Sequence, residues 1–151
     1  MRPFKVCAVV AMSMLFSTIG GSATHATAAD FAFLVAAGDY DRTELKPLKF
    51  ARADILAFQK ALIAAGYREP NIVVMHDDPD HSPKTRYLSL RNRIVEELTL
   101  LLASLEADDS LIVAFVGHGV QFSGEKESFF CPNDARLKNR ETLISFADVL
   151  K

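Results

Sequence analysis

The chain has 151 residues, a formal net charge of −2 and a sequence pI near 6.1. This slightly acidic balance argues against nucleic-acid binding, which usually requires a basic stripe or patch, so no nucleic-acid partner is expected. The two cysteines and four histidines follow no zinc-site spacing, so no metal site of that kind is expected.

Residues 1–29 are predicted to be a secretory signal peptide. Arg2 and Lys5 form a short basic region, residues 6–19 are apolar apart from small hydroxyl residues, and small residues precede cleavage points near Ala28 or Ala29. The protein is therefore expected to be secreted or periplasmic. The apolar run is shorter than the ~20 residues of a spanning helix, so no permanent membrane span is expected, with a membrane anchor as the alternative.

Residues 30–151 are predicted to form one α/β domain. Continuous apolar runs predict strands over residues 30–37, 71–76 and 111–116. Apolar residues at helical spacing predict helices over residues 50–65, closed by Gly66, and 84–106. Extended pieces are expected at residues 129–131 and 143–146, and Ser145 with Asp148 predicts the start of a further helix. Strands that alternate with helices indicate a mainly parallel sheet with helices on its faces.

The segment SLIVAFVGHGVQ (residues 110–121) is the most informative part of the chain, because His118 follows a strand and stands between two glycines. In open α/β sheets, ligands bind beyond the carboxyl ends of the strands, which is where His118 is expected to lie. Gly117 and Gly119 are expected to permit positive φ and a close approach of another chain to the imidazole. An imidazole with a pKa near ~6.5 can take and return a proton at neutral pH, which favours catalysis. The alternative is a histidine that only ends a strand at a tight turn.

Five segments together resemble the N-terminal part of a caspase-family peptidase domain, of the bacterial caspase-like and metacaspase-like kind. They are FAFLVAAGDY (31–40), LKPLKFARADIL (45–56), GYREPNIVVMHDD (66–78), DDSLIVAFVGHGVQ (108–121) and FFCPNDA (129–135). The resemblance implies a three-layer α/β caspase-like fold, mainly a parallel sheet with helices on both faces, present here in incomplete form. It also implies a cysteine-type endopeptidase acting on a polypeptide substrate. His118 then matches the histidine of the Cys-His dyad, and Gly119 matches a backbone N–H donor to the oxyanion.

The resemblance also implies a nucleophile that this chain does not supply. In caspases the catalytic cysteine lies about 50 residues after the histidine, which from His118 falls beyond Lys151. Cys131 is expected to be a buried, inert thiol. The chain is therefore expected to be truncated before its nucleophile and inactive by itself. The alternative is a non-catalytic module that binds a peptide or a partner chain; a small nucleotide-binding domain is disfavoured because the first strand-to-helix loop has one glycine, Gly38.

Acidic residues after the first two strands are further candidates. Asp39 could bind a basic substrate side chain, as the resemblance to metacaspases that prefer Arg or Lys implies; the alternative is a turn residue that bonds its own backbone. Asp77, Asp78 and Asp80 form a cluster whose carboxylates could bind calcium, which some metacaspases require. The cluster lacks the spacing and the closing glutamate of a calcium loop, so a solvated loop is expected. No cofactor is therefore expected, with calcium as the alternative.

Overall fold

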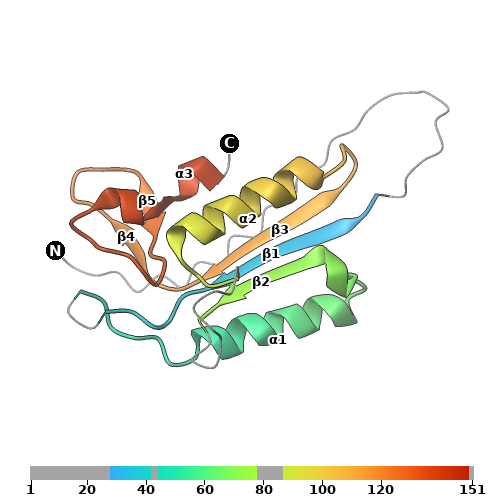
Figure 1. Cartoon of the computed structure of the whole chain (residues 1–151), viewed down its shortest axis with the longest axis horizontal. Coiled ribbons are helices and arrows are strands. Elements are labelled where there is room, and N and C mark those ends of the chain that lie inside the picture. The colour runs from blue at the N-terminus through green and yellow to red at the C-terminus, as the bar shows by residue number, and fades with distance from the viewer. Residues whose placement is uncertain (1–27, 42–43, 78–86, 150–151) are drawn as a thin grey trace.

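The computed structural model describes residues 28–41, 44–77 and 87–149, and its main part has three layers (Figure 1). A three-stranded sheet lies in the middle, with a helix on each face. Strands β1 (Asp30–Ala36), β2 (Ile72–His76) and β3 (Ser110–Val116) follow the order β2-β1-β3, and both pairings are parallel. The α/β fold with a mainly parallel sheet is therefore confirmed.

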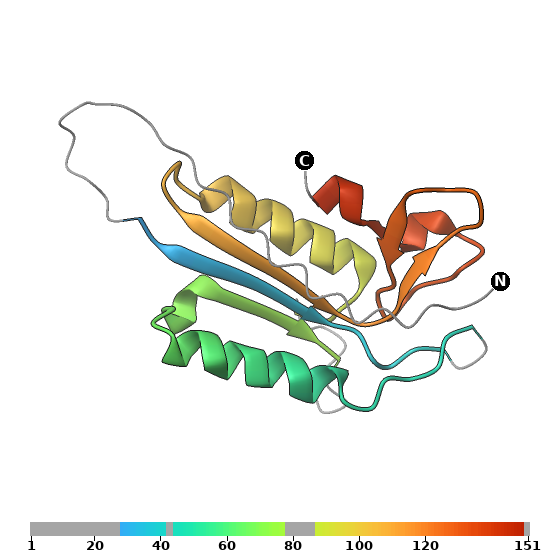
Figure 2. The same cartoon turned by 180° about the vertical axis from the view of Figure 1, so that it is seen from behind.

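The side chains of β1 alternate between two hydrophobic cores. Phe33 and Val35 contribute to a core shared with helix α2 (Arg91–Ser104), whereas Ala32 and Leu34 contribute to a core shared with helix α1 (Ala51–Ala64). Successive side chains of a strand point to opposite faces, so a strand covered on both faces requires a continuous apolar run. The two helices cover opposite faces of the sheet, as the views from the front in Figure 1 and from behind in Figure 2 show.

Helix α1 ends at Ala64 and is closed by Gly66, as the sequence predicts. Gly66 N donates to Ile63 O and Tyr67 N donates to Leu62 O, each at 3.0 Å. Gly66 has a φ of 106°, the left-handed conformation that this pair of hydrogen bonds requires. The glycine therefore closes the helix and turns the chain back toward β2.

Helix α2 begins at Arg91, later than the expected start at Lys84, which lies outside the described residues. Leu90 is extended, with a ψ of 143°. The first turn is capped from a distant part of the chain, because Asp134 Oδ1 accepts a hydrogen bond from Arg91 N at 2.9 Å. Apolar spacing alone does not reveal this cap, which explains why the predicted start is too early.

A second, smaller sheet lies beyond the carboxyl end of β3 (Figure 2). It consists of β4 (Gly119–Gln121), β5 (Ser128–Phe130) and β6 (Ile144–Ser145), antiparallel in the order β4-β5-β6. The extended pieces predicted near residues 129–131 and 143–146 are confirmed, whereas the sequence pattern does not predict β4, whose three residues are too few to show a period.

The remaining elements are short. Two 3₁₀ helices, η1 (Glu69–Asn71) and η2 (Arg140–Thr142), precede β2 and β6. Helix α3 (Phe146–Val149) starts as expected with Ser145, whose Oγ accepts a hydrogen bond from Asp148 N at 3.3 Å. Within the described part of the chain, no helix is both long and apolar enough to cross a membrane.

Candidate active site

His118 lies between the two sheets, two residues after β3 ends and one residue before β4 begins. Ala36 at the end of β1 is in register with both His76 on β2 and Val116 on β3. The carboxyl ends of all three parallel strands therefore meet at one edge, and His118 stands at this edge. Edges of this kind are where open α/β sheets bind ligands.

The glycines beside His118 serve a different purpose from the one the sequence predicts. Neither Gly117 nor Gly119 has a positive φ, so the expectation that they adopt one is wrong. A Cβ on Gly117 would lie 2.6 Å from Phe130 Cε2 and 2.8 Å from Tyr40 Oη. Gly117 is therefore required because two aromatic side chains approach the backbone just before the histidine.

The imidazole of His118 is oriented by a backbone carbonyl. Its Nε2 lies 2.7 Å from Lys46 O. A carbonyl oxygen only accepts hydrogen bonds, so Nε2 carries the proton and donates it. In the neutral ring, Nδ1 then has the lone pair and is the nitrogen that can act as a base. The chain thus selects one tautomer of His118 through a group that does not titrate.

Tyr40 fixes the backbone of His118. Its hydroxyl accepts a hydrogen bond from His118 N at 3.1 Å and donates one to Cys131 O at 2.8 Å. In the opposite direction the backbones of Cys131 and His118 are bonded directly, because Cys131 N donates to His118 O at 2.9 Å. The Tyr40 hydroxyl therefore bridges His118 N and Cys131 O, where an antiparallel pair would otherwise have a direct backbone hydrogen bond. The two rings are also in contact, with centroids 5.0 Å apart and planes tilted by 51°.

Tyr40 keeps its proton because its environment disfavours the phenolate. Its side chain is only 4% exposed. Burial raises the pKa of Tyr40 well above its ordinary value; the hydrogen bond with the His118 backbone lowers it by less, and the nearby Cys131 and Asp77 raise it further. The hydroxyl therefore remains a donor to Cys131 O at all physiological pH values.

The thiol of Cys131 is unsuited to nucleophilic attack. Cys131 is fully buried, and burial raises the pKa of its thiol to about 12. Because the thiolate is the reactive form, a thiol with this pKa is inert near neutral pH. This agrees with the expectation from the sequence. The backbone of Cys131 supports His118, but its sulfur takes no part in the site.

Gly119 opens β4 opposite Phe130. Antiparallel ladders alternate between bonded and non-bonded pairs, and Cys131 N donates to His118 O in the preceding pair. Gly119 and Phe130 are therefore a non-bonded pair, and the Gly119 N–H is directed away from β5. This leaves a backbone donor next to the imidazole.

Asp39 and Asp77 lie in the same part of the molecule. Asp39 is exposed and directly precedes Tyr40. Asp77 follows β2, and its charge acts on the Tyr40 hydroxyl. The other two members of the acidic cluster, Asp78 and Asp80, fall outside the described residues. Within the ranges that the structure describes, no group of three His, Cys, Asp or Glu residues could hold a metal ion.

Sequence reasoning missed the two residues that hold His118. The sequence predicts no site role for Tyr40, although a tyrosine among the polar residues after a strand signals an aromatic ring that returns to the core. Lys46 gave no signal, because every residue type offers the same backbone carbonyl. The contact joins residues 72 positions apart in the chain.

Comparison with known families gives a match over most of the chain. The family model "Metacaspase, peptidase C14 domain" matches residues 32–143, which is most of the chain. A comparison with curated proteins finds no match. The matched range includes most of β1, both long helices, His118 with its carbonyl partner, and the β4–β5 hairpin. The chain therefore belongs to the metacaspase family of C14 peptidases.

Proposed function

We propose that this chain supplies the histidine of a Cys-His dyad for the hydrolysis of polypeptides. The observation that carries the proposal is the 2.7 Å contact between His118 Nε2 and Lys46 O. It leaves Nδ1 as the basic nitrogen at the carboxyl edge of the parallel sheet. A general base contributes ~10²- to 10⁴-fold to rate when its basic atom is oriented in this way.

The proposed reaction uses Nδ1 twice in each half of the cycle. Nδ1 takes the proton of a cysteine thiol, and the sulfur attacks the peptide carbonyl carbon while Gly119 N–H donates to the developing oxyanion. When the C–N bond breaks, the imidazolium returns that proton to the leaving amine. Nδ1 next takes a proton from a water molecule as the water oxygen attacks the thioester. It then gives this proton to the cysteine sulfur as that sulfur leaves. Nε2 remains protonated throughout, so its hydrogen bond to Lys46 O persists.

The thiolate in this scheme comes from outside the 151 residues. Cys131 does not meet the requirement, because its thiol is buried and has a pKa of about 12. Among the described strands, β3 is an edge strand of the parallel sheet and pairs only with β1. A further strand added parallel to β3 would end beside His118, and we propose this as the route by which the cysteine arrives. The chain by itself is then inactive.

The proposed substrate is a polypeptide with a basic side chain before the scissile bond. Asp39 is exposed beside Tyr40, and Asp77 places negative charge in the same region. A carboxylate that meets an Arg or Lys side chain forms a charge-assisted hydrogen bond. Asp39 is therefore the residue proposed to bind the substrate.

Proteolysis by the native polypeptide that contains this sequence tests the proposal. Fluorogenic peptides ending in Arg or Lys should be cleaved, and His118→Ala should lower kcat/KM by at least ~10²-fold. Gln121→Ala is the matched control: this residue is exposed on β4, three positions from His118, and its Nε2 donates to Lys126 O within the hairpin. The isolated 151-residue chain should not cleave the peptides. Equal activity of the His118→Ala variant and the wild type would refute the proposal.

We also propose that residues 1–29 direct export and are removed. N-terminal sequencing of protein recovered from the medium or periplasm should begin after Ala28 or Ala29.

The scheme above uses no cofactor. If added calcium changes the peptidase rate of the native polypeptide and substitution of Asp78 and Asp80 abolishes that change, the calcium alternative replaces this expectation.

A further inference from the structure

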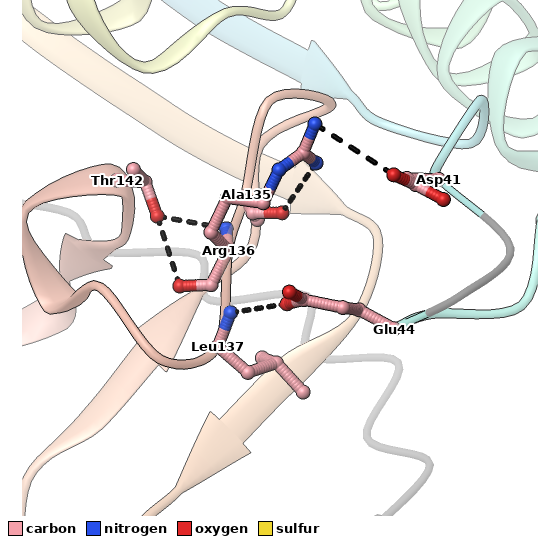
Figure 3. A network of polar contacts seen from close by, with 6 residues as sticks. All are labelled: Asp41, Glu44, Ala135, Arg136, Leu137 and Thr142. Atoms are coloured by element: carbon pink, nitrogen blue, oxygen red, sulfur yellow. Dashed lines mark hydrogen bonds and ion pairs between the residues drawn. The ribbon is translucent and has the colours of Figure 1, made fainter.

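The segment that carries Lys46 is attached to the loop after β5 by two polar contacts (Figure 3). Glu44 Oε2 accepts a hydrogen bond from Leu137 N at 2.6 Å. Arg136 Nη2 lies 3.7 Å from Asp41 Oδ2. Both contacts join segments more than 90 positions apart, and we call the pair the latch. The latch connects the β1–α1 loop to the part of the chain that follows Cys131.

The loop side of the latch is held in a compact turn. Arg136 N donates to Thr142 Oγ1 at 2.8 Å, as Figure 3 shows, and Asn139 N donates to Arg136 O at 2.8 Å. Thr142 N in turn donates to Asn139 O at 3.1 Å. Leu137 N therefore projects from a closed turn and gives Glu44 a fixed partner.

Lys46 lies between the latch and a second anchor. On one side, Leu48 N donates to Gly38 O at 2.9 Å, which fixes the chain as it enters α1. On the other side are Glu44 and the side chain of Leu45, which is 8% exposed and packs in the core. The carbonyl of Lys46 is thus supported from both directions, because Glu44 and Leu48, each two positions from Lys46, make polar contacts to other parts of the chain.

The two latch contacts differ in strength. Asp41 and Arg136 form a long ion pair whose side chains are 43% and 48% exposed, and exposed pairs contribute ~0–1 kcal/mol. Glu44 makes a short, charge-assisted hydrogen bond to a partly buried amide, a stronger class of interaction. The Glu44 carboxylate is therefore the main element of the latch.

We propose that Glu44 is a positioning residue for His118: it holds the Lys46 carbonyl where that carbonyl keeps the proton of the imidazole on Nε2. The role of Glu44 in catalysis rests on the proposed function of His118. Without the latch, the Lys46 carbonyl moves away from Nε2, and the proton can occupy Nδ1, which removes the lone pair from the nitrogen that acts as base. Glu44 is distant from the imidazole in the sequence and acts on it only through Lys46.

Imidazole NMR of the full 151-residue chain tests this proposal directly. In ¹⁵N-labelled wild type at mildly alkaline pH, His118 should show a protected Nε2–H proton and a pyridine-type Nδ1. Glu44→Ala should abolish the protected proton signal and increase the Nδ1–H population several-fold. Glu44→Gln should retain the wild-type pattern, because the amide oxygen can still accept from Leu137 N. His118→Gln identifies the resonances.

Two further variants keep the test decisive. Glu125→Ala is the matched control. It removes an acidic side chain of the β4–β5 turn that pairs with Arg140, and it leaves both latch contacts in place. It should leave the His118 spectrum unchanged. If Glu44→Ala does not fold, Glu44→Asp shortens the side chain by one methylene and should still increase the Nδ1–H population. A folded Glu44→Ala or Glu44→Asp variant with the wild-type His118 spectrum overturns the proposal, since Leu45 packing would then suffice.

Peptidase measurements separate this inference from the proposed function. In an active native polypeptide, Glu44→Ala should lower kcat several-fold with a smaller change in KM, and Glu44→Gln should restore it. If the native polypeptide does not cleave peptides but Glu44 still controls the tautomer, the proposed function fails and the positioning link stands. If cleavage depends on His118 but the tautomer does not depend on Glu44, the reverse holds.

Discussion

Replacement of Tyr40 by phenylalanine isolates the hydroxyl that bridges His118 and Cys131. The phenylalanine ring can occupy the same buried site, so the apolar packing of Tyr40 is retained. Two hydrogen bonds are lost, one of 3.1 Å from His118 N and one of 2.8 Å to Cys131 O. The variant therefore measures the bridge and little else.

The structure sets the size of the effect. Cys131 is fully buried, so its carbonyl oxygen has no access to water when the hydroxyl is removed. An unsatisfied buried polar group costs ~1–3 kcal/mol. His118 is only partly buried, so the loss of the acceptor for its N–H should cost less. We expect Tyr40→Phe to lower the free energy of unfolding by about 1–3 kcal/mol at neutral pH.

The pH dependence has a definite sign. The pKa of Tyr40 is raised in the folded protein, chiefly by burial, above its ordinary value of 10.0. The unfolded chain therefore loses the phenolic proton first, and the stability from this group is complete below pH 10 and falls as pH rises above it. Phenylalanine has no such proton. The stability difference between wild type and Tyr40→Phe should therefore shrink above pH 10.

Urea unfolding at pH 7 and above pH 10 measures both quantities, with Tyr67→Phe as the control tyrosine. Tyr67 packs against the core shared with α1, near Asp30 and Ser110 at the amino ends of β1 and β3, and is only partly buried, so its loss of a hydroxyl should cost less. Backbone amide shifts should move at His118 in the Tyr40 variant only. Equal unfolding midpoints for wild type and Tyr40→Phe at neutral pH, with an unchanged His118 amide, would refute the reasoning.

Smaller effects are expected at Gly117, Cys131 and Asp134. Gly117→Ala should destabilise the fold by ~1–3 kcal/mol in urea unfolding, because its Cβ would lie 2.6 Å from Phe130 Cε2; a neutral effect would contradict the steric argument. Cys131 should resist alkylation at pH 8 in the folded chain and react quickly in urea, because burial raises its pKa to about 12. Its contribution to stability should be complete below its ordinary pKa of 9.0 and should be lost as pH rises toward 12, so Cys131→Ala should flatten the alkaline stability curve. Asp134→Ala should cost ~0.5–2 kcal/mol by removing the acceptor for Arg91 N, whereas Asp134→Asn should recover most of it; equal loss in both variants would show that the cap is not the cause.

The framework of the fold follows from local patterns in the sequence. The apolar runs of β1 and β3 predict strands buried on both faces, and the Gly66 signal predicts where α1 ends. The placement of His118 at the edge of the sheet also follows, because it stands directly after a strand in a parallel arrangement. These features depend on neighbours within about one helix or strand length. Over that range, the pattern of residue types predicts the local structure.

The contacts that orient His118 join distant segments and leave no local signal. Lys46 acts through a carbonyl that any residue would provide, and Glu44 reaches a backbone amide 93 positions away. Asp134 caps a helix that begins 43 positions earlier. A glycine after a strand predicts an unusual backbone conformation, but Gly117 instead makes room for two rings. Such contacts become predictable only once the chain has been placed in three dimensions.

The groups that hold His118 directly differ in kind from those of the latch. His118 is held by a hydroxyl, a carbonyl and an amide, and none of these changes its charge near neutral pH. The raised pKa of Tyr40 extends this neutrality well above the physiological range. The latch is built from carboxylates and a guanidinium, and the side chains of its Asp41–Arg136 pair are about half exposed. Because salt screens exposed charges while leaving buried neutral hydrogen bonds almost unchanged, ionic strength should weaken the Asp41–Arg136 pair of the latch before it disturbs the immediate contacts of the imidazole.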